Sequence, residues 1–384
     1  MLVARMERSD IRDRTPHFAS LNAGYDGCAA GMSSSTSDIL FERRGAAGLV
    51  TLNRPAALNA VTHGMVRALR ARLERWRDDA AVTRVVVTAA GERAFSAGGD
   101  LRALYDLGQA GRYDEMLGFF GDEYRLNARI KRYRKPYVAL IDGIVMGGGV
   151  GISVHGSHRV AGDRFTFAMP VVGIGFFPDV GGTWFLPRLP GELGTYCALT
   201  GERLKAEDGV AGGVATHRVR SVKLPELVEA LCTAVPVDAM LGAFAEPAGE
   251  GPIMAQWGAI GWLFQGAQVE DILGRLDAEA AGDGTHTDFA RATAALMRTK
   301  SPTSLKLVLA QIRRGAHLDF AECMRTEFRI VSRVVRGHDF YEGTRAVIVD
   351  KDQAPRWRPP TLAAVSAAEV ERHFAPLAAE LDLP

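Results

Sequence analysis

Two glycine-rich segments, each placed between an apolar run and a plausible helix, constrain the fold of this chain most strongly. The first, at 94–100, reads Ala-Phe-Ser-Ala-Gly-Gly-Asp, and the second, at 146–151, reads Met-Gly-Gly-Gly-Val-Gly. They follow the apolar runs 85–88 and 137–141. Glycines at such junctions let backbone N–H groups approach one oxygen without interference from a Cβ atom, and a helix N-terminus adds unpaired donors and partial positive charge. If the two turns converge, they form an oxyanion hole, which stabilises a carbonyl oxygen as it gains negative charge.

The segments around these turns alternate between strand and helix patterns. Short apolar runs at 49–53, 85–88 and 137–141 predict strands. A helix is predicted from about residue 62, because five apolar residues recur there at helical spacing: Met65, Val66, Leu69, Leu73 and Trp76. A mixed helical region follows at 101–134, with a break near Gly111. Strands and helices that alternate in this way predict an α/β fold built from repeated β-turn-α units.

The last third of the chain is predicted to be helical. Ser301 and Pro302 provide an N-cap and a first-turn proline for a helix that ends at Gly315. A second helix is predicted from about 319 to 336, where Gly337 stops it.

These patterns divide the chain into three parts. We expect a disordered N-terminal extension at 1–36, in which Met32 is a second candidate start, a core at 37–235, and a helical C-terminal region at 236–384.

The composition narrows the class of protein. A formal net charge of +1 gives no electrostatic reason to expect nucleic acid or a membrane surface as a partner. The four cysteines are scattered, without a CxxC pair or metal-ligand spacing, so we expect reduced thiols in a cytoplasmic protein and no metal site.

An ordered series of motifs carries a resemblance to a known family. The series consists of Leu52–Pro55 with Leu58–Ala60, the turn 94–100, Lys135–Ile141, Met146–Gly151, Phe177–Gly182 with Phe185–Leu189, Ser301–Lys306, Arg336–Gly343 and Asp350–Gln353. Over about 37–375 the chain resembles the crotonase (enoyl-CoA hydratase/isomerase) superfamily, and within it the 3-hydroxyisobutyryl-CoA hydrolase subgroup. The resemblance implies a crotonase-like spiral of β-β-α units with a helical C-terminal region. It also implies an acyl-CoA thioester substrate from branched-chain amino-acid breakdown, no cofactor apart from the CoA of that substrate, and a homo-oligomer as one option.

The resemblance also assigns roles to particular residues. The amides of Ala97 and Gly148 would hold the thioester oxygen, and Asp179 would be the catalytic carboxylate. The substrate-binding residues would be Glu123, Gly98, Gly99, Asp100 and Val171.

One position departs from the family pattern. Hydratases of the superfamily carry glutamates at the positions of Gly151 and Val171, and the hydrolase subgroup keeps the second of these in a Met-Pro-Glu motif. This chain has Met169-Pro170-Val171 instead. Valine cannot accept a proton, attack a carbonyl or hold a water, so ordinary hydration is not expected.

Three functions stay open on the sequence. They are a thioester hydrolase that uses Asp179, an enoyl-CoA isomerase that uses the same single carboxylate, and an acyl-CoA binding protein with impaired catalysis. Ser153 and His155 do not form a GxSxG motif, and we expect them to be structural.

Overall fold

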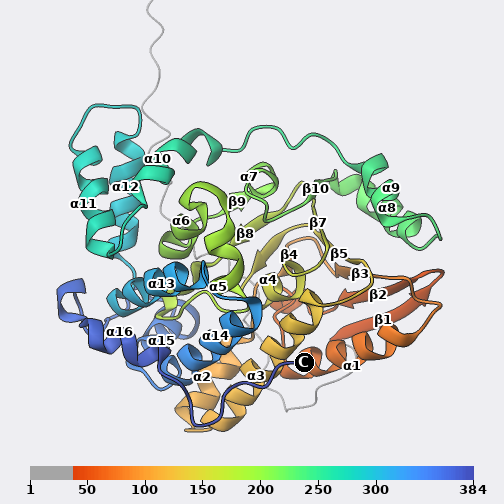
Figure 1. Cartoon of the computed structure of the whole chain (residues 1–384), viewed down its shortest axis with the longest axis horizontal. Helices are drawn as coiled ribbons and strands as arrows, with labels where there is room; N and C mark the ends of the chain where they lie inside the picture. The colour runs from red at the N-terminus through yellow and green to blue at the C-terminus, as the bar shows by residue number, and fades with distance from the viewer. Residues whose placement is uncertain (1–37) are drawn as a thin grey trace, which may run out of the picture.

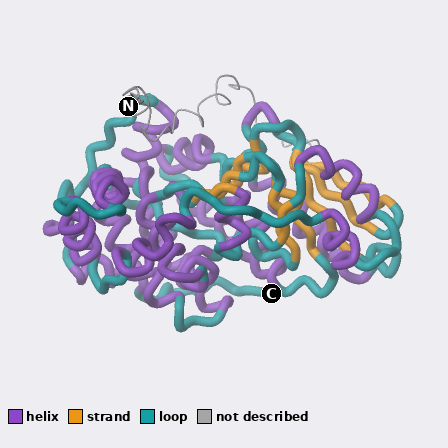
Figure 2. The backbone as a smooth tube through the Cα atoms, turned by 90° about the horizontal axis from the view of Figure 1, so that it is seen from above, coloured by secondary structure: helices purple, strands orange, loops and turns teal. Residues whose placement is uncertain are grey.

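The computed structural model describes residues 38–384, so the predicted extension at 1–36 lies outside the described residues. Strands gather in one half of the molecule, and helices fill most of the other (Figure 2). The strands of residues 38–384 form two sheets. The larger sheet has the order β1-β2-β3-β5-β7-β10, and the smaller sheet has the order β4-β6-β8-β9.

The larger sheet is mainly parallel. Its strands are β1 (Ile39–Arg44), β2 (Ala47–Leu52), β3 (Arg84–Ala89), β5 (Tyr137–Ile141), β7 (His158–Ala161) and β10 (His217–Arg218). Only the first pair, β1 with β2, is antiparallel. Successive side chains of a strand point to opposite faces. Accordingly, Val85 and Val87 of β3 enter the main core, while Val86 packs beneath the helices that carry Leu227 and Leu241.

The smaller sheet consists of β4 (Ala94–Ser96), β6 (Ile144–Met146), β8 (Thr166–Ala168) and β9 (Leu204–Lys205). Its first three strands run parallel, and β9 is antiparallel to β8. Each of β3, β5 and β7 is followed along the chain by one strand of the smaller sheet and then by a helical segment. The predicted α/β architecture of β-β-α units is therefore confirmed.

The first helices agree with the sequence patterns. α1 (His63–Asp78) begins after Thr62, whose side chain accepts the Met65 N–H, and its five predicted apolar residues are buried. The region predicted at 101–134 forms α2 (Leu101–Gln109) and α3 (Tyr113–Lys131). They are separated at Gly111, which has a positive φ of 69° that favours glycine.

Helices dominate the rest of the chain. Next come α4 (Gly148–Ser153), α5 (Gly182–Phe185), α6 (Leu193–Thr200), α7 (Ala206–Ala211), α8 (Leu224–Leu231), α9 (Val237–Phe244), α10 (Trp257–Leu263), α11 (Val269–Ala280) and α12 (Thr287–Arg298). The last four are α13 (Pro302–Gly315), α14 (Phe320–Val334), α15 (His338–Thr344) and α16 (Ala367–Phe374). Ser301 caps α13 by accepting the Ser304 N–H, as predicted. Within residues 38–384, no helix is long and apolar enough to cross a membrane.

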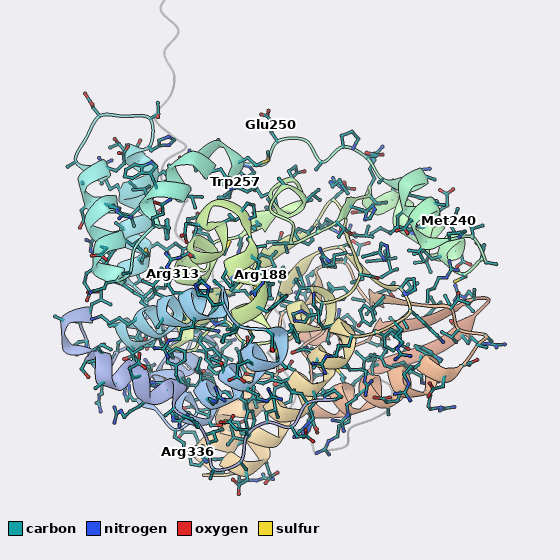
Figure 3. The ribbon with its side chains drawn as sticks, in the orientation of Figure 1. Arg188, Met240, Glu250, Trp257, Arg313 and Arg336 are labelled. Carbon is teal, nitrogen blue, oxygen red and sulfur yellow. The ribbon has the colours of Figure 1, made fainter. Side chains whose placement is uncertain are left out.

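The C-terminal helices pack against the core around α5 and α6 (Figure 1). Two arginines labelled in Figure 3 make this attachment polar as well as apolar. Arg188 donates to the carbonyls of Gly315 and Leu318, each at 3.0 Å, and Arg313 pairs with Glu192 at 2.8 Å. Hydrogen bonds and an ion pair therefore connect the C-terminal helices to the segment that follows α5.

Candidate active site

The two glycine-rich turns meet, as the sequence predicts. β4 and β6 lie side by side in the smaller sheet, so the turns that follow them come together. A Cβ atom added at Gly147 would lie 3.4 Å from the Cα of Gly98. Both residues have positive φ, 45° at Gly147 and 114° at Gly98. This close approach and backbone conformation together require glycine.

The structure corrects one predicted donor of the oxyanion hole. The Ala97 N–H donates to the Leu58 carbonyl at 3.0 Å, so it is not available to a ligand. In the β-bridge between Val61 and Gly99, the Val61 N–H donates to the Gly98 carbonyl, and the Asp100 N–H donates to the Val61 carbonyl. The Gly99 N–H takes no part in this bridge.

Gly148 is the second candidate donor. It is the first residue of α4, and the N–H groups of a first helical turn have no partner within the helix. The Gly99 nitrogen lies 3.4 Å from the position of a Cβ added at Gly148. The amides of Gly99 and Gly148, rather than those of Ala97 and Gly148, are therefore the candidate pair for an oxyanion hole.

A largely apolar cavity lies next to these amides. It encloses about 680 Å³, including the part open to solvent. Its wall contains most of the predicted site residues, namely Ala97, Gly98, Gly99, Glu123, Gly148, Val171 and Asp179. Asp100 is not part of this wall. Its carboxylate caps α2 through the Ala103 N–H and pairs with Arg54 at 3.2 Å, so it supports the turn instead of facing the cavity.

Sequence reasoning missed the apolar side chains that shape the cavity. They are Leu101, Leu104, Phe119, Phe120, Ile174, Phe176, Val347 and Ile348. Val347 and Ile348 belong to a π-helical turn, Arg345–Val349, and such turns are frequent at functional sites. In the sequence, Val347 and Ile348 stand just before the predicted Asp350–Gln353 motif. That position marks the segment but does not reveal which of its side chains face the site.

Asp179 is a buried carboxylate within this wall. Its side chain is only 5% exposed and accepts a hydrogen bond from the Tyr124 hydroxyl at 3.0 Å. Burial disfavours the charged form and raises the pKa of Asp179 to about 7, although the Tyr124 hydrogen bond acts in the opposite direction. A carboxylate with this pKa can accept a proton near neutral pH.

Glu123 is the second acidic side chain of the cavity. It is buried, and its Oε1 atom has no hydrogen-bond partner. Burial, followed by the nearby charges of Asp179 and Glu327, raises the pKa of Glu123 well above its ordinary value. Oε1 would lie 2.5 Å from a Cβ added at Gly148, so this acid sits directly beside one amide of the site. The protonated form is the one favoured there.

The positions of the two hydratase glutamates lack carboxylates in this chain. Val171 lies in the 3-10 turn Pro170–Ile174 and contributes only apolar surface to the cavity. At Gly151, an added Cβ would lie 2.7 Å from Asn127 Nδ2 and 2.8 Å from Val180 Cβ. A side chain at 151 would therefore collide with α3 and with the residue that follows Asp179.

Ser153 and His155 bond to the main chain. The Ser153 hydroxyl donates to the Gly149 carbonyl at 2.8 Å, and His155 Nε2 donates to the Val180 carbonyl at 2.7 Å. Burial lowers the pKa of His155 to about 3, so this imidazole is neutral. Their contacts agree with the structural roles that the sequence predicts. Within residues 38–384, no group of three or more His, Cys, Asp and Glu side chains could hold a metal ion.

Comparison with known proteins identifies the family. A sequence model described as enoyl-CoA hydratase/isomerase matches residues 47–374. The chain belongs to this family. It is 46% identical over 355 residues to the mitochondrial 3-hydroxyisobutyryl-CoA hydrolase of Danio rerio, covering 90% of this chain and 91% of that protein. The enzyme of the same name from Homo sapiens is 40% identical over 352 residues, covering 89% of each chain.

Solved structures of family members share the whole fold. A carnitinyl-CoA dehydratase from Mycobacterium thermoresistibile aligns with a TM-score of 0.85 at 44% identity, covering 90% of this chain and 99% of that one. An enoyl-CoA hydratase from Rhodobacter sphaeroides aligns with a TM-score of 0.83 at 38% identity, covering 90% and 100%. The crotonase-type fold expected from the motifs is confirmed.

The comparisons correct the expected location. The curated relatives described above are named as mitochondrial proteins, which overturns the expectation of a cytoplasmic protein. A net charge of +1 and scattered cysteines do not distinguish the cytoplasm from other reducing compartments.

Proposed function

We propose that this family member hydrolyses a short acyl-CoA thioester of the 3-hydroxyisobutyryl-CoA type, within the breakdown of valine. The observation that carries the proposal is that the amides of Gly99 and Gly148 and the buried carboxyl of Asp179 belong to one apolar cavity. The names of the curated relatives supply the substrate class. CoA enters as part of the substrate, and no separate cofactor is needed.

The geometry supports a direct role for the backbone in the reaction. The thioester oxygen accepts hydrogen bonds from the Gly99 and Gly148 amides, which become stronger as the oxygen gains charge in the tetrahedral state. Asp179 takes a proton from the attacking water, whose oxygen bonds to the carbonyl carbon. The oxyanion then re-forms the C=O bond as the carbon–sulfur bond breaks, and the leaving thiolate of CoA takes the proton from Asp179, which restores the carboxylate. Removing one oxyanion-hole donor, a side chain in the enzyme where this was measured, slows turnover by about 10²–10³-fold.

Hydration of a double bond fits this site poorly. That reaction needs carboxylates that place and activate a water across the double bond, and the two family positions are Gly151 and Val171 here. The solved relatives that are named as a hydratase or a dehydratase therefore support the fold rather than the reaction of this chain. Asp179 remains as the single proton acceptor for hydrolysis.

Thiol titration with purified full-length chain tests the proposal. We expect free CoA to be released from 3-hydroxyisobutyryl-CoA, and Val171→Glu to release it at least about tenfold faster by supplying a second acid–base group. Asp179→Asn is the matched control and should be slow. If the unmodified chain releases no CoA, the proposed activity is wrong.

The same samples separate the two other functions. Migration of the double bond in a 3-enoyl-CoA without CoA release would identify an isomerase. Tight acyl-CoA binding without turnover, with activity gained only in Val171→Glu, would identify an impaired binding protein. The homo-oligomer stays a proposal as well, and light scattering of the purified chain tests it.

A further inference from the structure

The turn that carries Asp179 has a backbone conformation that needs outside support. We call residues 178–183 the Asp179 turn. Val180 has a φ of 50°, a left-handed conformation that is strained for a β-branched residue. Strain of this kind persists only where the surrounding structure holds the backbone in place. The contacts of the turn show which residues do so.

Two side chains of the C-terminal helical region bind the main chain of the Asp179 turn. Glu327 of α14 is fully buried, and its two carboxyl oxygens accept the N–H groups of Gly181 at 2.8 Å and Thr183 at 2.9 Å. Gln311 of α13, also fully buried, donates to the Pro178 carbonyl at 2.6 Å and to the Thr183 hydroxyl at 2.7 Å.

A third contact with the Asp179 turn comes from a residue that precedes it in the sequence. The His155 ring, which follows α4, donates to the Val180 carbonyl at 2.7 Å. Polar groups on both sides of Asp179 along the backbone are thus fixed by buried side chains. Such hydrogen bonds are strong where water is excluded, and an unpaired buried partner is costly.

We propose that Glu327, assisted by Gln311, is a positioning residue that holds the strained Asp179 turn so that the Asp179 carboxylate faces the thioester. Glu327 does not touch the substrate, since it is not part of the cavity wall. The inference rests on the proposed hydrolase function. It assigns to the C-terminal helices a task in the reaction, in addition to their packing.

Glu327→Gln is the first test, because glutamine can accept one of the two N–H groups but places its own NH₂ against the other. A displacement of about 1 Å at a reacting group can slow turnover about 10²-fold. We therefore expect kcat to fall by about 10²-fold while KM stays within about threefold. Gln311→Met, which removes the bond to Pro178, should act in the same direction if Glu327→Gln fails to fold.

Asp208 offers a matched control. It is 1% exposed, and its Oδ1 accepts the N–H groups of Ile253 at 3.0 Å and Met254 at 3.1 Å, but it is not part of the cavity wall. Asp208→Asn should therefore lower the stability as Glu327→Gln does, while kcat stays at the unmodified value. Hydrogen exchange provides the structural readout. Glu327→Gln should exchange faster at 179–185 and Asp208→Asn at 250–256.

The outcomes separate the inference from the function on which it rests. If the unmodified chain releases no CoA, the proposed function fails and the positioning role fails with it. Two results with an active unmodified chain would overturn the positioning role alone. One is an equal fall of kcat in Glu327→Gln and Asp208→Asn. The other is faster exchange at 179–185 in Glu327→Gln without loss of kcat.

Discussion

The pH dependence of hydrolysis follows from the environment of Asp179. Burial raises the pKa of this carboxyl to about 7, and only its ionised form can take a proton from water. The ionised fraction therefore falls to about one in ten at pH 6 and about one in a hundred at pH 5, and kcat/KM should fall by the same factors. Above about pH 8 the profile should be level.

Asp179→Asn should remove this profile together with most of the rate. Asparagine keeps the size of the side chain and can still accept the Tyr124 hydroxyl, so the fold and acyl-CoA binding should survive. Loss of general-base help lowers kcat by about 10²–10⁴-fold, or about 3–5 kcal/mol in the barrier. The assay is CoA release followed by thiol titration across the pH range, with binding measured by calorimetry. A flat profile in the unmodified chain, or an unimpaired Asp179→Asn variant, would refute the reasoning.

Three further predictions concern neighbouring residues. Gly148→Ala places a Cβ 2.5 Å from Glu123 Oε1, so it should weaken thioester binding and slow CoA release by at least about tenfold, as saturation kinetics would show. Glu123→Gln, which keeps a hydrogen-bond donor, should retain more activity than Glu123→Leu; equal loss in both would mean that the ionised carboxylate is required. Because burial raises the pKa of Asp179 to about 7 and of Glu327 to about 8, the folded state holds protons that the unfolded state loses above about pH 4. The free energy of unfolding should therefore fall as the pH rises from about 4 to about 8, and a urea titration series should show a shallower fall in Asp179→Asn.

Local patterns predicted the local structure well. The apolar spacing from Met65 to Trp76 gave the buried face of α1, and Ser301 with Pro302 gave the start of α13. These features depend on neighbours in sequence, since helical spacing and caps act within a few residues. The convergence of the two glycine turns was instead implied by the family resemblance, which places both turns at one thioester oxygen.

The pairing of the amides in the glycine-rich turns could not be predicted in the same way. The Ala97 N–H is occupied by the carbonyl of Leu58, which comes from a loop before α1. Only the tertiary structure shows which N–H of a glycine-rich turn is already paired. The cavity wall formed by Val347 and Ile348, and the contacts of Glu327, likewise join segments more than one hundred residues apart. The periodicity of apolar residues in the sequence does not predict such contacts.

The proposed hydrolysis requires that the amides of Gly99 and Gly148 bind the thioester oxygen. Isotope-edited infrared spectroscopy of a carbonyl-¹³C acyl-CoA bound to Asp179→Asn, which should not turn it over, tests this directly. Two donors polarise the carbonyl, so its stretching frequency should fall on binding. A bound thioester whose frequency equals that in water or rises above it would contradict the account.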